Sequence, residues 1–435
     1  MTNTIANKLQ SVTNCNATIT KFSQINPHWQ EKIKQSFLGS TESVYLVSPN
    51  TIEALSAIVK TARQKQWQIV PCGSGSKLDW GGLSKDVQLF LSTQKCDSII
   101  EHAVDDLTIT VEAGILLADL QAKLKATNQF LPIDPVFSES ATIGGILATA
   151  DTGSLRQRYG GIRDLVLGIS FVRGDGEIAK AGGRVVKNVA GYDLMKLFIG
   201  SYGTLGIISQ VTLRTYPIPE TSQTVVLTGR AEQIERAIQL IKNSSLTPTA
   251  ADLVTASVAK KLGIKESTAL LVRFQAIAES ASSQTAQLTE IVKELAIEIT
   301  TYTEQAEQDL WQQLVSIVRI PLTPEAIICK FGILPTEAIA LLQKLDRVDS
   351  NSCAMLHTAS GIGTLQLTLN DASAIQKIRT FCNSNYGFLS ILTAPQEIKQ
   401  KIDIWGYKGN ALEMMKTIKN KFDPQNLFSS DRFVL

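Results

Sequence analysis

The chain has 435 residues, and at about 100 to 200 residues per domain this length predicts two or three folding units, not one small module. Its 42 Lys and Arg residues nearly balance its 40 Asp and Glu residues, and no block of like charge occurs, which excludes the electrostatic footprint of a protein that binds nucleic acid or a membrane surface. A small molecule or another protein is therefore the expected partner.

The N-terminal 37 residues are expected to form a helical segment. Residues 1–15 are polar and lack the apolar core of a signal peptide, and no run approaches the roughly 18 apolar residues of a membrane span, so we expect a cytoplasmic location. The six cysteines include no C-x-x-C pair, which favours reduced thiols over a zinc, iron–sulfur or disulfide site.

The next region is rich in glycine loops. A helix is predicted over 52–62 from its apolar spacing, with Asn50 as its N-cap and Glu53 as the reciprocating residue of a capping box. A loop with Gly73, Ser74, Gly75 and Ser76 follows a short strand. That strand is 67–70, and three further strands are predicted after the loop at 87–92, 99–104 and 107–111.

The second half of this region is predicted to contain helices, a hairpin and a final strand. The predicted helices are 116–127, a small-residue segment opening at 142–145, and one that ends near 199. The segments 165–172 and 177–180 flank Gly174-Asp175-Gly176, which predicts a β-hairpin because glycine supplies positive φ. A strand over 207–214 precedes Pro217 and Pro219, where we place a domain border.

Beyond that border the glycine loops give way to longer strands and helices, which predicts an α+β cap domain over 218–400 with an antiparallel or mixed sheet. Its expected strands are 224–228, 269–275, 326–331, 353–357, 364–368 and 389–392. Its expected helices are 231–243, 280–294, 336–345 and 372–382. The segment 401–435, with a helix over 411–421, is expected to pack back on the first domain.

The glycine loops suit a large phosphorylated cofactor. Glycine lets backbone N–H groups approach a diphosphate closely and point into one concavity. A nicotinamide-binding Rossmann site is disfavoured, because Leu78 stands where the third glycine belongs and a strand follows instead of a helix. Further clusters at 142–145, 153–161 and 203–206 favour a cofactor that lies between two subdomains over a set of independent turns.

The ordered landmarks resemble the FAD-binding domain of the vanillyl-alcohol-oxidase and p-cresol-methylhydroxylase family over residues 38–217. They are Val47-x-Pro49-x-Thr51-x-Glu53, Pro71-x-Gly73-x-Gly75-Ser76, Thr142-Ile143-Gly144-Gly145, Gly174-Asp175-Gly176 and Lys187-x-x-x-Gly191-Tyr192-Asp193-Leu194, running on to Gly203-Thr204-Leu205-Gly206. The resemblance implies an α+β fold with a two-subdomain FAD-binding domain and a cap.

The resemblance also implies which residues contact FAD. It assigns 73–76 to the diphosphate, and Ile207 or Ile208 to the adenine end. The full set of implied cofactor-binding residues is Pro71, Gly73, Ser74, Gly75, Ser76, Leu78, Pro135, Thr142, Gly144, Gly145, Ser154, Gly160, Ile207 and Ile208. Members that tether FAD use a histidine in the first loop, sometimes with a later cysteine, and neither place matches here, so non-covalent FAD is expected.

Within that family the chain looks most like the FAD-binding E subunits of bacterial glycolate oxidase (glycolate dehydrogenase). The resemblance lies in the sequence of residues 187–194 and in the ending Phe422-Asp423-Pro424-x-x-Leu427-Phe428. This similarity implies a catalytic flavoprotein subunit and an iron–sulfur subunit as partners, with peripheral membrane attachment through them. The larger relatives carry a metal-binding His-x-Gly-Asp-Gly-Asn-x-His signature. Here only His357 and Gly361 fit it, so no metal is expected.

Oxidation of a 2-hydroxy acid needs a base and a group that orients the carboxylate. The candidates are Lys187, Tyr192 and Trp405 with Lys408, and each has an ordinary structural explanation as a surface charge or packing residue. Two function hypotheses remain: an FAD-dependent oxidoreductase subunit that passes electrons to an iron–sulfur partner, and a flavin-stabilised assembly subunit without electron transfer of its own. A free-standing FAD-dependent dehydrogenase for glycolate or D-lactate is a third, more distant alternative.

Overall fold

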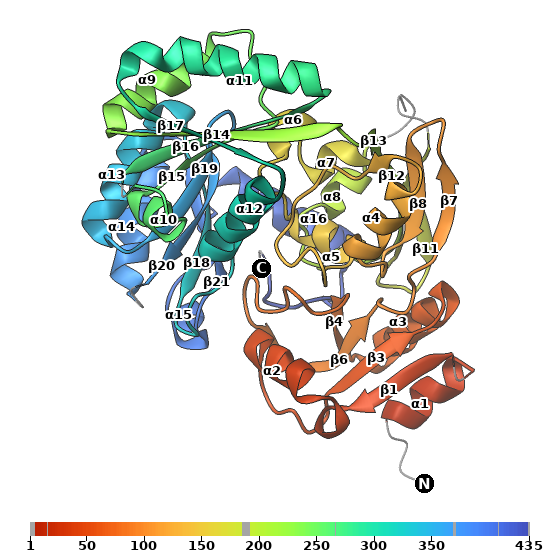
Figure 1. Ribbon diagram of the computed structural model, residues 1–435. Helices are drawn as coiled ribbons and strands as arrows, with labels where there is room; N and C mark the ends of the chain where they lie inside the picture. The colour runs from red at the N-terminus through yellow and green to blue at the C-terminus, as the bar shows by residue number, and fades with distance from the viewer. Residues whose placement is uncertain are drawn as a thin grey trace. The chain divides into compact units, whose positions relative to one another are not determined.

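The computed structural model describes residues 5–14, 16–184, 192–265, 267–368, 371–407 and 409–433. It divides into two compact units. The first comprises Met1–Thr152, Gly161–Ile218 and Tyr407–Leu435, and the second comprises Gly153–Gly160 and Pro219–Gly406. The N-terminal 37 residues thus fall in the first unit, and the segment Gly153–Gly160, which we expected within the 38–217 domain, falls in the second unit (Figure 1).

One sheet of the first unit has four strands in the order β1-β3-β6-β4. Its strands are β1 (Ala17–Lys21), β3 (Tyr45–Pro49), β6 (Val87–Ser92) and β4 (Gln68–Cys72). Both faces are buried, and alternate residues of β6 point to opposite sides. Leu89 and Leu91 pack in a cluster with helix α3 (Ile52–Lys65), whereas Phe90 packs in a second cluster with helix α2 (Pro27–Ser36).

Helix α3 begins at the expected residue, Ile52, but its N-cap lies one residue later than predicted. Its N-cap is Thr51, whose hydroxyl accepts a hydrogen bond of 3.1 Å from the N–H of Ala54. The prediction that Asn50 caps this helix is therefore wrong, because Thr51 already holds the extended backbone conformation that an N-cap requires. The helix ends at Gln66 in the left-handed conformation, with a φ of 56°.

A second sheet of the first unit has five antiparallel strands in the order β11-β10-β12-β8-β7. They are β11 (Ile178–Gly182), β10 (Val166–Val172), β12 (Ile207–Arg214), β8 (Thr108–Glu112) and β7 (Ile99–Ala103). The predicted hairpin is confirmed by the antiparallel pairing of β10 with β11, in which Gly168 lies opposite Gly182. Helices α4 (Leu117–Lys125) and α5 (Ile143–Thr149) contribute to the core beside this sheet.

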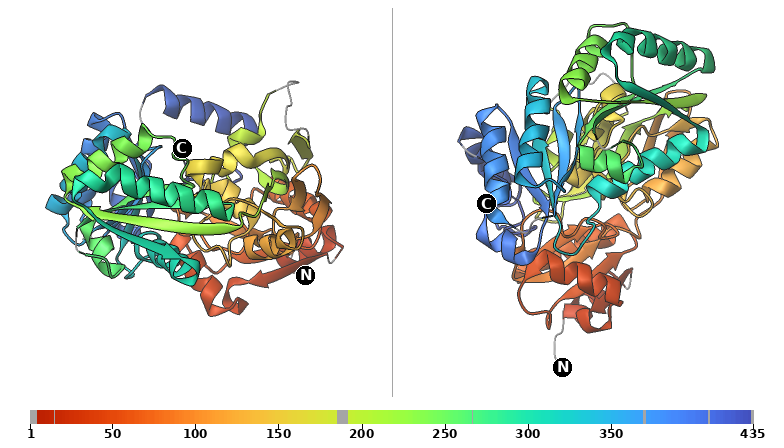
Figure 2. Two further views of the ribbon diagram at one scale, coloured as in Figure 1. Left: turned by 45° about the horizontal axis from the view of Figure 1, so that its top comes forward. Right: turned by 60° about the vertical axis from the view of Figure 1, so that its left-hand side comes forward.

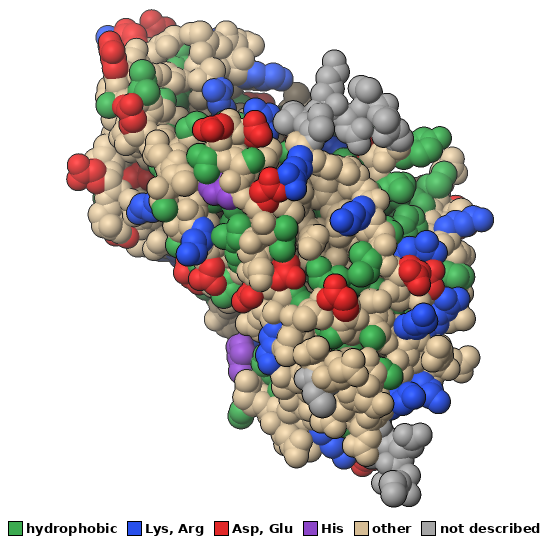
Figure 3. Space-filling view, turned by 90° about the vertical axis from the view of Figure 1, so that its right-hand side faces the viewer, with side chains coloured by type: hydrophobic (Ala, Val, Ile, Leu, Met, Phe, Trp, Pro, Cys, Tyr) green, Lys and Arg blue, Asp and Glu red, His purple; other side chains and the backbone are tan. Residues whose placement is uncertain are grey.

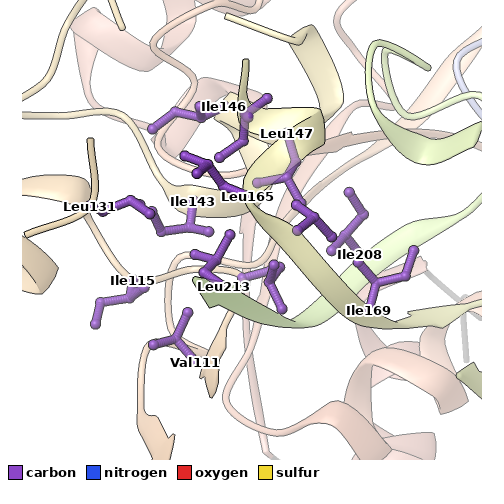
Figure 4. Packing of buried hydrophobic residues seen from close by; sticks show 14 of the residues in the cluster. Val111, Ile115, Leu131, Ile143, Ile146, Leu147, Leu165, Ile169, Ile208 and Leu213 are labelled. Carbon is purple, nitrogen blue, oxygen red and sulfur yellow. The ribbon is translucent and has the colours of Figure 1, made fainter. Parts of the chain in front are cut away.

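Figure 4 shows how that core fixes the position of α5. Ile143, Ile146 and Leu147 of the helix lie beside Ile208 and Leu213 of β12. All of these side chains are buried, so α5 and the start of β12 are held against each other by apolar packing. The two segments also border the pocket described below.

The second unit is built on one eight-stranded sheet in the order β17-β14-β16-β15-β19-β20-β18-β21, and every neighbouring pair is antiparallel. The strands are β17 (Glu298–Thr303), β14 (Thr221–Gly229), β16 (Thr268–Ala276), β15 (Ala250–Val254), β19 (Cys353–His357), β20 (Ile362–Leu367), β18 (Ile327–Gly332) and β21 (Phe388–Thr393). The expected α+β class is confirmed. The strands β15 and β17 were not expected from the sequence.

Helices pack on the sheet of the second unit. The helices α9 (Ala231–Lys242) and α11 (Ala278–Val292) contact β14 and β16 (Figure 2). The helices α10 (Ala256–Lys261) and α12 (Glu304–Arg319) share a buried cluster with alternate strand residues such as Val226 and Leu271. The remaining helices include α13 (Ala338–Val348) and α14 (Ala372–Ser384), which contact each other.

The surface carries both signs of charge. On the face shown in Figure 3, Lys and Arg side chains are interspersed with Asp and Glu side chains. This agrees with the nearly balanced composition of 42 basic and 40 acidic residues. Within the described part of the chain, no helix combines the length and the apolar character that a membrane crossing needs.

Candidate functional site

The first unit contains a pocket with about 700 Å³ of empty space, open solvent at its mouth included. Five chain segments that are distant in sequence form it: the loop after β4, the residue after β6, helix α5 with its N-cap, the turn into β12 and the C-terminal segment. The lining residues are Pro71, Cys72, Gly73, Ser74, Gly75, Ser76, Lys77, Leu78, Thr93, Thr142, Gly144, Gly145, Ala148, Thr149, Ser201, Tyr202, Gly203, Gly206, Ile207, Ile208 and Arg432.

The loop after β4 presents backbone donors to this pocket. Among the described residues, none accepts a hydrogen bond from the backbone N–H groups of residues 73–76. Gly73 and Gly75 are buried, and Gly75 has a φ of 75°, which favours glycine. Because a buried N–H group without an acceptor is costly, these four donors suit a bound anion such as a diphosphate.

The loop is held against α5 by close packing. A Cβ placed on Gly73 would overlap the hydroxyl and the Cβ of Thr142, so this position needs glycine. Thr142 is the N-cap of α5, and its hydroxyl accepts a hydrogen bond of 3.2 Å from the N–H of Gly145. The hydroxyl of Ser74 donates to the carbonyl oxygen of Ser140. These contacts join two of the glycine clusters singled out in the sequence at one pocket.

Two cationic side chains line the pocket, and both are buried. The Nζ of Lys77 lies 2.9 Å from Oδ2 of Asp151, which also accepts a hydrogen bond of 3.1 Å from the N–H of Val136. The Arg432 guanidinium donates a 3.0 Å hydrogen bond to the carbonyl oxygen of Lys77. Burial lowers the pKa of Arg432, and the nearby Asp79 carboxylate opposes this effect. No Asp or Glu is among the described lining residues.

An aromatic residue and a thiol complete the lining. The ring of Tyr202 stacks on Phe433 with centroids 5.5 Å apart, and burial raises the pKa of its hydroxyl. Cys72 is half-buried, yet desolvation raises the pKa of its thiol from 9.0 to about 12. A thiol with such a pKa stays protonated at neutral pH and is a poor nucleophile.

Most of the residues predicted to bind the cofactor line this pocket. They are Pro71, Gly73, Ser74, Gly75, Ser76, Leu78, Thr142, Gly144, Gly145, Ile207 and Ile208. The residues that the sequence analysis missed include Lys77, Tyr202 and Arg432. Tyr202 precedes the Gly203–Gly206 turn and could have been found from that turn. Arg432 lies 355 residues from Lys77, and no local pattern marks it.

Pro135, Ser154 and Gly160 are absent from the described pocket lining. Pro135 is buried next to Val136, whose N–H binds Asp151. Ser154 lies in the second unit, where its hydroxyl donates to Oδ2 of Asp252. The other carboxylate oxygen of Asp252 lies 2.6 Å from Nδ1 of His357. All three side chains are buried, so this network holds the segment Gly153–Gly160 on β15 and β19.

The candidate catalytic residues are not brought together. Lys187 and Lys408 lie outside the described residues. Tyr192 is 90% exposed, and Trp405 is buried in the second unit, where its carbonyl oxygen accepts a hydrogen bond from Ser390. Within the described ranges, no group of three or more His, Cys, Asp or Glu side chains could hold a metal ion.

Sequence comparisons identify the pocket-bearing region. Residues 44–182 match the family described as "FAD binding domain". The chain is 33% identical over 198 residues to glycolate oxidase subunit GlcD of Bacillus subtilis (strain 168), a match that covers 46% of this chain and 42% of the relative. It is 33% identical over 201 residues to glycolate oxidase subunit GlcE of Escherichia coli (strain K12), a match that covers 45% of this chain and 55% of the relative. The matches thus span only about half of each relative.

Another relative is the mitochondrial D-lactate dehydrogenase [cytochrome] of Arabidopsis thaliana, 35% identical over 181 residues, which covers 42% of this chain and 32% of the relative. Among solved structures, p-cresol methylhydroxylase with substrate bound has a TM-score of 0.74 at 13% identity, over 98% of this chain and 96% of the other. The chain therefore has the p-cresol-methylhydroxylase-type fold, and it contains an FAD-binding domain.

Proposed function

We propose that this chain is the FAD-binding subunit of a glycolate (2-hydroxy acid) oxidase or dehydrogenase complex. The single observation that carries the proposal is the pocket at residues 73–78, where four backbone donors lack acceptors among the described residues within the matched FAD-binding domain. The names of the relatives, glycolate oxidase subunits and D-lactate dehydrogenases, support 2-hydroxy acids as the substrate class.

The residues of this chain would bind and orient the cofactor. The N–H groups of residues 73–76 would hold the diphosphate, because they are the donors in the pocket that lack acceptors. Gly144 and Gly145 of α5 line the pocket beside this loop, and Ile207 and Ile208 supply an apolar wall. Bound FAD supplies a two-electron acceptor for oxidation of a hydroxyl to a carbonyl group.

We propose that the FAD is bound without a covalent link. Among the described residues that line the pocket there is no histidine, and the one cysteine, Cys72, has a thiol whose pKa is raised to about 12. A protonated thiol does not attack a flavin readily. The cofactor should therefore leave the protein on denaturation.

The proposal includes partners. A catalytic flavoprotein subunit would provide the catalytic base, and an iron–sulfur subunit would accept the electrons. Support comes from the two relatives named as glycolate oxidase subunits. We propose a cytoplasmic location, peripheral to the membrane only through such partners.

The experiment is an anaerobic titration of the complex, copurified through a tag on this chain, with glycolate and with D-lactate. Bleaching of the visible flavin band in proportion to all bound flavin supports an oxidoreductase subunit. Bleaching of only the partner's flavin supports the alternative, a flavin-stabilised assembly subunit. Two observations favour that alternative: Tyr192 is exposed, and the ring of His357 is hydrogen-bonded to Asp252. No bleaching with either acid would contradict the proposed substrate class.

A free-standing FAD-dependent 2-hydroxy acid dehydrogenase is tested with the chain alone. Turnover of glycolate or D-lactate with an artificial electron acceptor would support it. Inactivity of the flavin-loaded chain with both acids would exclude it and leave the subunit hypotheses.

A further inference from the structure

The C-terminal segment is built into the first unit beside the pocket. Helix α16 (Asn410–Phe422) ends at Asp423, whose carboxylate accepts hydrogen bonds of 2.9 and 2.8 Å from the N–H groups of Leu427 and Phe428. Phe428 then forms a parallel bridge to Ile69 of β4, which continues the four-stranded sheet beyond its edge strand. The chain after α16 is therefore fixed by backbone contacts to the same strand that leads into the glycine loop.

Arg432 follows this bridge and reaches the glycine loop. Its backbone carbonyl accepts a 2.9 Å hydrogen bond from the N–H of Gly82, and its guanidinium donates to the carbonyl of Lys77. Asp431, the residue before it, has a φ of 61°, in the left-handed region that aspartate tolerates better than most non-glycine residues. The side chain is 5% exposed. The hydrogen bonds to Gly82 and to Lys77 thus hold the buried Arg432 guanidinium at the pocket wall.

The charges around the pocket favour an anion beside Arg432. Lys77, the other cation of the lining, is engaged by Asp151, which lies outside the lining. The half-buried Asp79 acts on Arg432 but also lies outside the described lining. Arg432 lines the same pocket as the loop donors of residues 73–76, and a planar guanidinium matches a phosphate through two parallel hydrogen bonds.

We propose that Arg432 is a cofactor-binding residue that pairs with the FAD diphosphate, so that the C-terminal segment completes the site begun by residues 73–76. The diphosphate is the part of oxidised FAD that carries negative charge at neutral pH, and it is what the loop donors suit. This inference rests on the FAD site of the proposed function, and it does not depend on the substrate or the partners.

The test compares ligands that share one part of FAD. The full-length chain is stripped of flavin, and binding of FAD, ADP-ribose and riboflavin is measured by titration calorimetry for wild type, Arg432→Gln and Lys85→Gln. Lys85 is the matched control, because it lies 3.7 Å from Asp431 of the same segment, is 57% exposed and is outside the lining. We expect Arg432→Gln to weaken FAD and ADP-ribose alike, by about 10- to 100-fold, with riboflavin binding unchanged. Lys85→Gln should change none of them.

Other outcomes separate the inference from the function it rests on. If Arg432→Gln leaves ADP-ribose binding unchanged, or weakens riboflavin instead, Arg432 does not hold the diphosphate, although the FAD site stands. If wild type binds neither FAD nor ADP-ribose, both the site and the inference are wrong.

A conservative variant keeps the test informative if Arg432→Gln does not fold. Arg432→Lys keeps the charge and loses the planar fork, so we expect ADP-ribose affinity to fall by at least about threefold while the far-UV circular dichroism spectrum is kept. Unchanged ADP-ribose affinity in folded Arg432→Lys would contradict bidentate pairing.

Discussion

Lys77 and Asp151 form an ion pair of 2.9 Å whose side chains are only 3% and 1% exposed. They come from the loop after β4 and from the chain that follows α5, and the same carboxylate binds the N–H of Val136. One buried carboxylate therefore connects three segments at the pocket. The Lys77–Asp151 pair serves mainly to hold these segments in place, because a buried ion pair adds little stability compared with an apolar pair of the same size.

We expect removal of one member of this pair to cost far more than removal of both. Asp151→Asn leaves the buried charge of Lys77 without its carboxylate, and it should lower the free energy of unfolding by about 3 to 5 kcal/mol in urea titrations. The double variant Lys77→Met/Asp151→Leu should lose less than the sum of the single variants. A strictly additive double-mutant cycle would show that the pair is not coupled.

The exposed pair Lys85 and Asp431 is the comparison for this effect, with side chains 57% and 44% exposed. Solvent screens this pair, so Lys85→Met should change the free energy of unfolding by less than about 1 kcal/mol.

We expect Gly73→Ala to disrupt the pocket, because the added methyl group would overlap Thr142, the N-cap of α5. The variant should lose about 1 to 3 kcal/mol of stability and should retain much less FAD after purification, measured as the ratio of visible to ultraviolet absorbance. Gly183→Ala is the control, since no atom lies within 4 Å of a Cβ there. Equal flavin content in the two variants would contradict the close packing of the loop on α5.

Cys72 should resist alkylation well above neutral pH. Burial raises the pKa of its thiol from 9.0 to about 12, so at a given pH below 9 the ratio of thiolate to thiol is about a thousandfold lower than in the unfolded chain. Iodoacetamide labelling at pH 8.5, followed by mass spectrometry of the Cys72 peptide, should be slow in the native protein and fast in urea. Similar native and denatured rates would show that the thiol is not desolvated.

The raised pKa of the Cys72 thiol also makes the stability of the protein depend on pH. The folded protein keeps the Cys72 proton to a higher pH than the unfolded chain does, so this thiol's contribution to stability is complete below about pH 9 and is lost as the pH rises towards about 12. The Cys72→Ala variant should show a smaller fall of unfolding free energy over that interval.

Ser154→Ala should weaken the second unit, because it removes the hydroxyl that donates to the buried Asp252 carboxylate. We expect a loss of about 1 to 3 kcal/mol in the free energy of unfolding, and a smaller loss of FAD affinity than in Gly73→Ala. Asp252→Ala should be the more destabilising change, because both Ser154 and His357 lose their partner. Thermal melts that match wild type for both variants would contradict this network.

Local signals were sufficient for much of the fold. β6 and β12 have the bounds expected from their apolar, β-rich sequences, and the glycines around Asp175 marked the hairpin. β15 was missed because it is buried at every position and contains Asp252, which breaks the apolar run that usually marks such a strand. β17 was missed because its sequence, EITTYT, is polar and mostly exposed.

The candidate site was only partly predictable for a different reason. Glycines 73, 75, 144 and 145 could be singled out because a requirement for glycine leaves a mark on the sequence at each position. Lys77 and Arg432 are set by partners 74 and 355 residues away, so their burial follows from tertiary contacts that no local pattern records. Ser154 sits in a glycine cluster like the others, but its hydroxyl is engaged by Asp252 of the second unit.

The central claim is that this chain binds FAD non-covalently through the pocket at residues 73–78 and 142–145. The most direct measurement is the visible absorption spectrum of the purified full-length chain before and after heat denaturation and filtration. We predict a flavin band that passes the filter with the released cofactor, and that is lost from Gly73→Ala. A band retained with the denatured protein would contradict non-covalent binding, and a chain without flavin that takes up none from added FAD would contradict the claim itself.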